Sequence, residues 1–195
     1  MAKHVRFPGQ YCYINESGKV VIPGTFVFSE GLASVLDENT DKLGFIDETS
    51  KVVIPCQWES VGDFNEGLAA VKDEHDMWGF IDKTGKVVIP CQWSWTLWFV
   101  NVWAFVENEQ GKFGFIDKTG KVVIPCQWKH SDSFFEGLAP GQDEHEKWGY
   151  IDTTGKLVIP CQWKYAGNFC EGIASVWKRG KCFHIDKTGN IVEKC

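Results

Sequence analysis

The sequence predicts an all-β protein built from tandem repeats of about 35 residues, each contributing three strands. One observation is repetition, because residues 79–93 recur unchanged at 114–128 and with small changes at 44–58 and 149–163. Another is composition, because the repeated segment consists of short β-branched and aromatic runs separated by turn residues. No stretch shows a 3.6-residue apolar period long enough for a helix.

An isoleucine marks each repeat and indicates the domain organisation. The marker stands at Ile14, Ile46, Ile81, Ile116, Ile151 and Ile185, at spacings of 32 to 35 residues. A three-stranded repeat cannot bury both of its faces alone, so it must pack on its neighbours. We therefore expect one repeat domain over residues 1–195, with about six units and capping half-repeats at both ends.

Each repeat is predicted to contain a tight hairpin and a third strand. Residues 78–82 and 86–90 are the hairpin strands, and the turn at 82–85 has Asp first and Gly fourth. Asp accepts hydrogen bonds from turn amides, and Gly adopts positive φ at little cost. We expect Pro90 to end the second strand because it cannot donate to a ladder. The third strand, 67–71 in one copy, is expected to follow a loop of about eight residues.

The repeats can assemble in two ways. An open β-solenoid-like array continues from hairpin to hairpin, whereas a closed β-propeller-like ring makes each repeat a blade. Propeller blades usually have four strands and about 40 residues or more. The sequence has six hairpins but only five strands of the Glu-Gly-Leu-Ala type. We therefore expect the open array and keep the ring as the alternative.

The motif Trp-Gly-Phe/Tyr-Ile-Asp, at residues 78–82 and 148–152, resembles that of the bacterial WG-repeat family. The flanking Thr-Gly-Lys-Val-Val-Ile-Pro and Phe-x-Glu-Gly-Leu-Ala blocks fit the same family, and the resemblance runs from about residue 11 to 192. The namesake Trp is replaced by Leu43, Phe113 and Cys182, so its ring is not required in every repeat. The resemblance implies a bacterial β-repeat module and no activity that transfers residue by residue.

Charge and composition exclude several classes of partner. The net charge is −6 and the pI is about 5.4. Binding to a phosphate backbone or an anionic membrane requires a field of Lys and Arg, so we expect neither nucleic acid nor membrane as a partner. The sequence shows no signal peptide and no apolar run long enough to span a bilayer, and we expect a cytoplasmic protein.

The chain has eight cysteines, and four of them occupy one identical repeat position. These four are Cys56, Cys91, Cys126 and Cys161. We interpret them as free thiols that act as small hydrophobes, with stacked disulfides or metal binding as alternatives. No CxxC or Cys/His finger spacing occurs, so we expect neither a metal site nor a cofactor.

The third repeat, residues 93–106, breaks the pattern with a cluster of tryptophans. Trp95 and Trp98 stand where other repeats have polar, small or smaller aromatic residues: Ser60, His130 and Tyr165 for the first, and Asp63, Ser133 and Asn168 for the second. Large aromatic side chains on an exposed surface mark interaction sites. We therefore predict a ligand-binding surface formed by Trp95 and Trp98 together with Trp93 and Phe99. Trp103 replaces Leu68 and Leu138, and we expect it to fill core space.

Two columns of carboxylates recur along the chain. One consists of Asp47, Asp82, Asp117, Asp152 and Asp186, which we expect to cap turns. The other consists of Glu30, Glu66, Glu136 and Glu171, which we treat as structural with binding as a secondary possibility. The acidic loops 73–76 and 143–146 lack the ligand spacing of a calcium loop, so we expect solvated loops.

No nucleophile, phosphate-binding or metalloprotease motif is present. The sequence therefore favours a non-catalytic interaction module that binds a protein, a peptide or a glycan. A self-assembling structural protein, in which the aromatic patch forms a homo-oligomer contact, is the second hypothesis. A small enzyme that uses the two carboxylate columns is the third.

Overall fold

The computed structural model describes residues 12–14, 20–21, 28–100 and 102–195, and their regular elements are all β-strands. The strands form five sheets, and the chain divides into two compact units, Met1–Phe99 and Val100–Cys195. Among the described residues no sheet closes on itself. The prediction of an all-β tandem-repeat protein is therefore confirmed, whereas the expectation of one domain over the whole chain stays a prediction.

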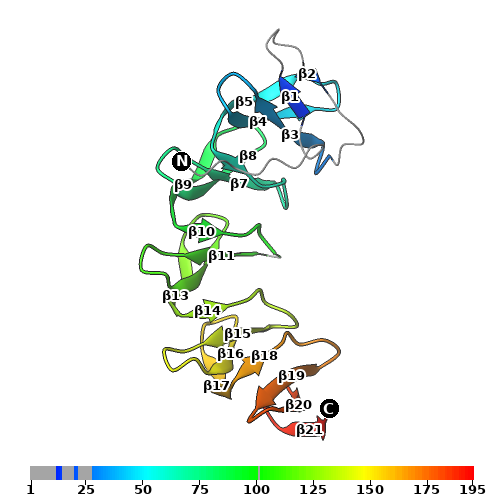
Figure 1. Cartoon of the computed structure of the whole chain (residues 1–195), viewed down its shortest axis with the longest axis vertical. Coiled ribbons are helices and arrows are strands. Elements are labelled where there is room, and N and C mark those ends of the chain that lie inside the picture. The colour runs from blue at the N-terminus through cyan, green and yellow to red at the C-terminus, as the bar shows by residue number, and fades with distance from the viewer. Residues whose placement is uncertain (1–11, 15–19, 22–27, 101) are drawn as a thin grey trace. The chain divides into compact units, whose positions relative to one another are not determined.

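Unit 1 contains two sheets and one further short strand, and most of its strands are labelled in Figure 1. The first sheet has the order β2-β1-β3-β4-β5, with β1 (Cys12–Ile14), β2 (Val20–Val21), β3 (Leu32–Asp37), β4 (Lys42–Asp47) and β5 (Val52–Trp58). The second has the order β6-β7-β8-β9, with β6 (Ser60–Val61), β7 (Leu68–Lys72), β8 (Trp78–Asp82) and β9 (Val87–Trp93). The short strand β10 (Trp95–Thr96) follows. All pairs are antiparallel except β1 with β3.

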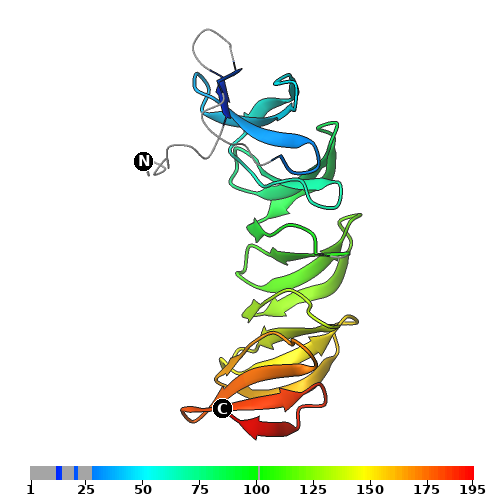
Figure 2. The ribbon, with the colours of Figure 1, turned by 90° about the vertical axis from the view of Figure 1, so that its right-hand side faces the viewer.

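Unit 2 repeats this plan. Its first antiparallel strands are β11 (Trp103–Glu107), β12 (Phe113–Asp117) and β13 (Val122–Trp128). The next sheet consists of β14 (His130–Ser131), β15 (Leu138–Gln142), β16 (Trp148–Asp152) and β17 (Leu157–Trp163). The last consists of β18 (Tyr165–Ala166), β19 (Ile173–Lys178), β20 (Lys181–Asp186) and β21 (Ile191–Lys194), and it forms the orange and red end of the chain in Figure 2.

The sheets that begin at β6, β14 and β18 have four strands, because a two-residue strand precedes the three predicted ones. In the β6 sheet this strand pairs Ser60 with Lys72 and Val61 with Val71. Two residues cannot show a hydrophobic period, so this strand leaves no signal in the sequence. The predicted count of three strands per repeat is corrected to four in these sheets.

The predicted end of the second hairpin strand at Pro90 is wrong, because β9 continues to Trp93. The pairing jumps from Phe80 with Ile89 to Trp78 with Trp93, so β9 bulges at Pro90. A proline is tolerated at a bulge because its missing N–H is not needed there. The bulged backbone crosses directly over Gly79, where a Cβ atom would lie 2.5 Å from the Ile89 carbonyl oxygen. Only glycine allows this approach, which explains the Gly that follows the namesake Trp.

The Glu-Gly pair forms the two-residue turn of a tight hairpin and is not simply the end of a long loop. Glu66 and Gly67 both have positive φ, at 53° and 87°, and Asn65 and Leu68 exchange two backbone hydrogen bonds across them. This is the geometry of a type I′ turn, which matches the twist of the flanking strands. The predicted eight-residue loop therefore contains a short strand and a tight turn.

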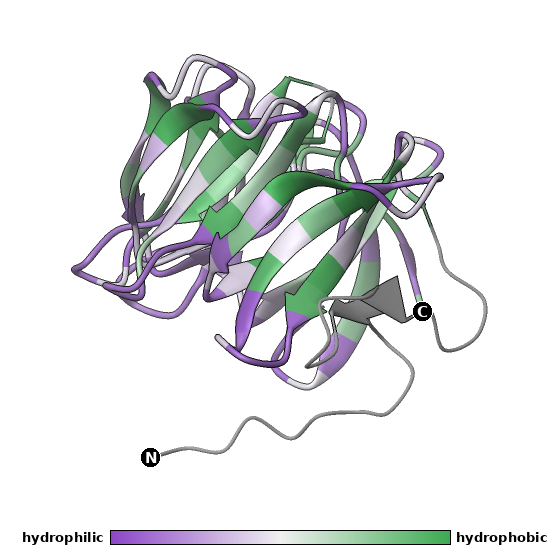
Figure 3. Cartoon of the chain, turned by 90° about the horizontal axis from the view of Figure 1, so that it is seen from above, coloured by the Kyte–Doolittle hydropathy of each residue, from purple (hydrophilic) through white to green (hydrophobic). Residues whose placement is uncertain are grey.

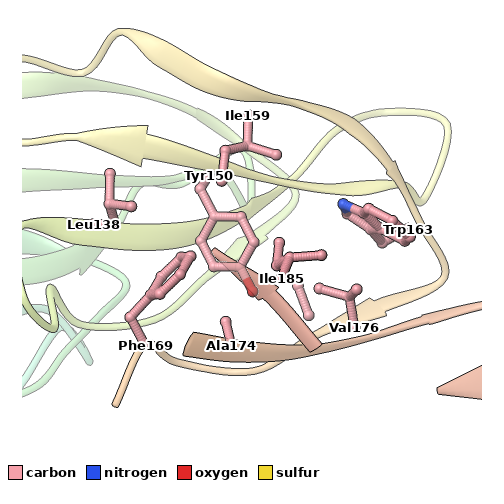
Figure 4. Close-up of a cluster of buried hydrophobic side chains, with 9 residues drawn as sticks. Leu138, Tyr150, Ile159, Trp163, Phe169, Ala174, Val176 and Ile185 are labelled. Atoms are coloured by element: carbon pink, nitrogen blue, oxygen red, sulfur yellow. The ribbon is translucent and has the colours of Figure 1, made fainter. Parts of the chain in front are cut away.

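Each unit has its own core between consecutive sheets. In unit 1, residues of the first sheet pack against Ala69, Val71 and Ile81 of the second sheet and against Phe64 in the loop between β6 and β7. The Phe45 and Phe64 rings are 4.8 Å apart. Figure 4 shows the matching cluster in unit 2, with the Tyr150 ring at its centre and Phe169 beside it. The marker isoleucines from Ile46 to Ile185 are fully buried. Figure 3 shows hydrophobic strand positions between hydrophilic loops.

None of the described residues forms a helix that is long and apolar enough to cross a membrane.

Candidate functional site

Two of the four predicted surface residues are exposed, and two are core residues. Trp95 is 36% exposed and Trp98 is 55% exposed. Trp93 is 7% exposed and Phe99 is 1% exposed, with the Phe99 ring 4.9 Å from Phe80. The inclusion of Trp93 and Phe99 in the binding surface is therefore corrected, because both side chains are occupied in packing. The candidate surface consists of Trp95 and Trp98.

The positions of Trp95 and Trp98 are surface positions in other repeats as well. His130 and Tyr165, which correspond to Trp95, are both exposed, and Asp63, which corresponds to Trp98, is exposed too. The remaining equivalents, Ser60, Ser133 and Asn168, are half-buried. The two positions are therefore common to the repeats, and only the third repeat has tryptophan at them. Their Cα atoms are at most about 11 Å apart, because the two residues are only three positions apart along the chain.

An aromatic pair at a spacing of 17 residues lies on the surface of the repeats in unit 2. The ring at the namesake Trp position contacts the ring 17 residues later: Phe113 lies 5.8 Å from His130, and Trp148 lies 6.3 Å from Tyr165. Tyr165 also meets Trp177 edge-on at 5.2 Å. Sequence reasoning missed this Trp148, Tyr165 and Trp177 cluster, although the constant spacing of 17 was visible.

The other aromatic residues of the third repeat fill space inside unit 2. Trp103 is half-buried, and its ring centroid lies 6.5 Å from that of Phe134. Phe105 is 7% exposed and stacks on Phe113 at 4.8 Å. These contacts agree with the expected packing role of Trp103.

The glutamate column joins consecutive repeats. The Glu30 carboxylate accepts a hydrogen bond from the Gly67 amide at 3.1 Å and pairs with Lys83 Nζ at 3.0 Å. Lys83 also donates to the Glu30 backbone carbonyl. These hydrogen bonds, with the Lys83 contact the largest, lower the pKa of Glu30. The carboxylate is therefore part of the scaffold, as its structural interpretation predicted.

Unit 2 contains the same contact three repeats later. Glu136 accepts from the Gly172 amide at 3.0 Å and pairs with Lys187 at 3.0 Å, which lowers its pKa. The sequence carried a signal for this link: where Asn101 replaces the glutamate, Thr153 replaces the lysine of the corresponding hairpin. Glu66 and Glu171 have the same positive φ, with Glu66 half-buried and Glu171 exposed.

The aspartate column caps turns, as expected. Asp82 Oδ1 accepts from the Thr84 amide at 2.8 Å, the Thr84 hydroxyl at 2.6 Å and the Lys86 amide at 3.1 Å. The Thr84 hydroxyl is the largest cause of the lowered pKa of Asp82. The other four members make the same three bonds: Asp47, Asp117, Asp152 and Asp186.

The acidic loops are hairpin turns of the same kind. Asp73 accepts from the amides of His75 and Met77, and Asp143 accepts from those of His145 and Lys147. The first carboxylate of each loop is therefore engaged by its own backbone, in agreement with a solvated structural loop.

The four repeat cysteines are free thiols. The thiols of Cys56, Cys91 and Cys161 point at backbone carbonyls of the neighbouring strand, at 3.7 to 4.0 Å. Burial raises the pKa of Cys91 and of Cys161 to about 11. A thiol with a raised pKa is a poor nucleophile near neutral pH. One disulfide, between Cys182 and Cys195, was not predicted.

Comparison with known proteins places this arrangement among repeat proteins. The family described as WG containing repeat matches residues 11–40, 44–74, 78–110, 113–140 and 148–182. No curated protein matches the chain. Among solved structures, the computationally designed Ika8 protein superposes with a TM-score of 0.51 at 11% identity, over 87% of this chain and 60% of that one. The chain therefore spans less than two thirds of that protein, and the likeness concerns the fold alone.

Two natural proteins are also similar in structure. BamB from Moraxella catarrhalis has a TM-score of 0.49 at 11% identity, over 94% of this chain and 66% of that one. The WD40 β-propeller domain of Doa1 has a TM-score of 0.40 at 10% identity, over 87% and 66% of the two chains.

Proposed function

We propose that this chain, which belongs to the WG-containing repeat family, is a non-catalytic interaction module. It presents Trp95 and Trp98 of the third repeat to a protein, a peptide or a glycan. The observation that carries the proposal is the 55% exposure of Trp98 and the 36% exposure of Trp95 at surface positions of the repeat. Exposed indole rings offer a rigid, flat apolar face that suits a sugar ring or an aromatic side chain.

The size of this surface predicts modest affinity from the two rings alone. Together they expose about 200 Å², which corresponds to about 5 kcal/mol of hydrophobic free energy when it is fully covered. Association itself costs about 4 kcal/mol or more. The two rings are therefore anchors that need further contacts around them, and their loss should weaken binding by at least about tenfold.

The hydrogen bonds and ion pairs that engage the carboxylates support a non-catalytic role. A general acid or base must be free to exchange its proton with a substrate. The turn aspartates each hold three hydrogen bonds, and Glu30 and Glu136 are paired with lysines. The net charge of −6 supports a partner other than nucleic acid or an anionic membrane.

Titration of glycan and peptide panels, followed by tryptophan fluorescence, tests the proposal. The variant Trp95→Ser/Trp98→Asn introduces residues that other repeats carry at these positions, so it should keep the fold. The matched control is Tyr165→Ser, which removes an exposed aromatic residue from the position equivalent to Trp95. We expect saturable binding that the double variant loses and the control keeps.

Binding that survives in the double variant would contradict the proposed surface. Light scattering on the same samples separates a ligand-binding surface from a homo-oligomer contact. An oligomer that dissociates in the double variant, with no ligand bound by the parent protein, would favour the self-assembly hypothesis.

A further inference from the structure

The last hairpin, β20 and β21, replaces two buried positions and one half-buried position of the other hairpins with metal-binding or polar side chains. Where the other hairpins have Leu43, Trp78, Phe113 or Trp148, this one has Cys182. His184 stands at the position of the buried rings Phe45, Phe80, Phe115 and Tyr150. Glu193 stands at the position of the buried Ile54, Ile89, Ile124 and Ile159. The repeat cysteine itself is kept, as Cys195.

The strand pairing gathers these side chains on one face of the sheet. His184 pairs directly with Glu193, and Phe183 pairs with Lys194, so Cys182 and Cys195 are opposite each other. Cys182 and His184 are two residues apart on β20 and therefore point to the same side. The potential ligand atoms of Cys182, His184 and Cys195 all lie within 4.8 Å of one another.

One ring nitrogen of His184 already faces a carboxylate, as is common for metal-bound histidines. Glu193 Oε1 lies 2.7 Å from His184 Nδ1. A carboxylate in this position orients the ring and raises its basicity as a ligand. Exposure of this hairpin explains why polar residues replace Phe and Ile there, but many polar residues would satisfy that need. It does not account for a second thiol, Cys182, and an oriented imidazole beside the repeat cysteine Cys195.

We propose that Cys182, His184 and Cys195 form a zinc site in the reduced protein. Two thiolates and one imidazole are a known zinc ligand set, and the fourth position is left to water. Ligand atoms around tetrahedral zinc lie about 3.5 Å apart, so the observed cluster needs only small side-chain movements. The four repeat cysteines lack an adjacent imidazole of this kind among the described residues, and the site is specific to the last hairpin.

The disulfide between Cys182 and Cys195 is the alternative state of the same site. Oxidised glutathione converts the zinc-bound form into the disulfide form, and a thiol or phosphine reductant reverses the change. The two thiolates lose two electrons and form the sulfur–sulfur bond, the glutathione disulfide accepts the electrons and two protons to give two thiols, and Zn²⁺ is released. Metal binding and the disulfide therefore exclude each other.

Cobalt titration of the full chain tests this site, because Co²⁺ bound by thiolates has charge-transfer and tetrahedral d–d absorption bands. With the protein kept reduced by a phosphine, we expect these bands to saturate at one equivalent and to disappear on adding Zn²⁺. Cys182→Ser and Cys195→Ser should lose the charge-transfer band. His184→Phe restores the residue of the other hairpins and should weaken Co²⁺ binding at least about tenfold. Cys170→Ser, which removes an exposed thiol elsewhere, should bind like the parent.

Three outcomes of the same titration would contradict the proposal. No thiolate-to-cobalt band in the reduced chain would overturn the proposal, as would bands unchanged in Cys182→Ser and Cys195→Ser. Protein oxidised with glutathione disulfide should show no band, and a full band in that form would also contradict it. Far-ultraviolet circular dichroism confirms that each variant is folded, and a chelator competition with Zn²⁺ provides an independent affinity for each.

Discussion

A methyl group added at Gly79 would collide with the backbone of the neighbouring strand. Its Cβ atom would lie 2.5 Å from the Ile89 carbonyl oxygen, 2.7 Å from the Cys91 amide nitrogen and 2.8 Å from the Pro90 carbonyl carbon. These are backbone atoms in a bulge, so no flexible side chain can move aside. Gly67, in the turn that precedes β7, is the control, because a Cβ atom there would meet nothing within 4 Å.

The two substitutions should differ in magnitude for separate physical reasons. Relieving the contacts at Gly79 requires β8 and β9 to move apart by roughly 0.5–1 Å, and overpacking of this kind costs about 3 kcal/mol. Gly67 has a φ of 87°, and Ala in a left-handed conformation costs about 1–2 kcal/mol. For a chain of this length each kcal/mol lowers Tm by about 2–4 °C. We expect Gly79→Ala to lower Tm by roughly 6–12 °C and Gly67→Ala by roughly 2–8 °C.

Urea denaturation and thermal melts, both followed by circular dichroism at a fixed protein concentration, measure the difference. The unfolding free energies of the two variants are compared with that of the parent chain. If Gly79→Ala were as stable as Gly67→Ala, or more stable, the close approach at the bulge would not explain the glycine after the namesake Trp.

Three further results are expected. In the folded state the pKa values of the turn aspartates lie below their ordinary value of 3.8. The ionised aspartates therefore stabilise the fold fully above pH 3.8, and this contribution is lost as the pH falls through the folded pKa values. Tm should therefore fall below about pH 4, and a Tm that stays constant down to about pH 2 would contradict the turn contacts. Alkylation at pH 8, resolved by mass spectrometry, should label exposed Cys170 at least about tenfold faster than Cys91 or Cys161. Burial raises the pKa of these two thiols to about 11. Equal labelling rates would show that Cys91 and Cys161 are not shielded. Tyr150→Phe removes the 2.7 Å hydrogen bond from the Tyr150 hydroxyl to the Gly167 carbonyl. Other hairpins have Phe at this position, so the free energy of unfolding measured with urea should fall by only about 1 kcal/mol. A loss above about 3 kcal/mol would show that the hydroxyl has a larger role.

The repeated parts of the fold were predictable because sequence period and strand period coincide. Near-constant spacing of the marker isoleucines predicted equivalent buried positions, and Ile46 to Ile185 occupy them. Pro90 was misjudged because a bulge removes the penalty that proline carries in a regular strand. The turn at Glu66 was missed because a glutamate with positive φ is uncommon.

The candidate site was predictable only where repeats could be compared with one another. The exposure of Trp98 follows from polar residues at the same position elsewhere. Trp93 and Phe99 look equally aromatic in the sequence, and only the packing shows that they are buried. The contact between Glu30 and Lys83 joins residues 53 positions apart, so no local pattern reveals it and only the joint replacement at Asn101 and Thr153 hints at it.

Fluorine NMR of protein labelled with 5-fluorotryptophan tests the central claim most directly. The chain has ten tryptophans, and single variants assign the resonances of Trp95 and Trp98. On titration with a peptide or glycan that binds, we predict that these two resonances shift together while the buried Trp58, Trp93, Trp128 and Trp163 stay in place. Shifts confined to other tryptophans, with Trp95 and Trp98 unchanged at saturation, would contradict a binding surface in the third repeat.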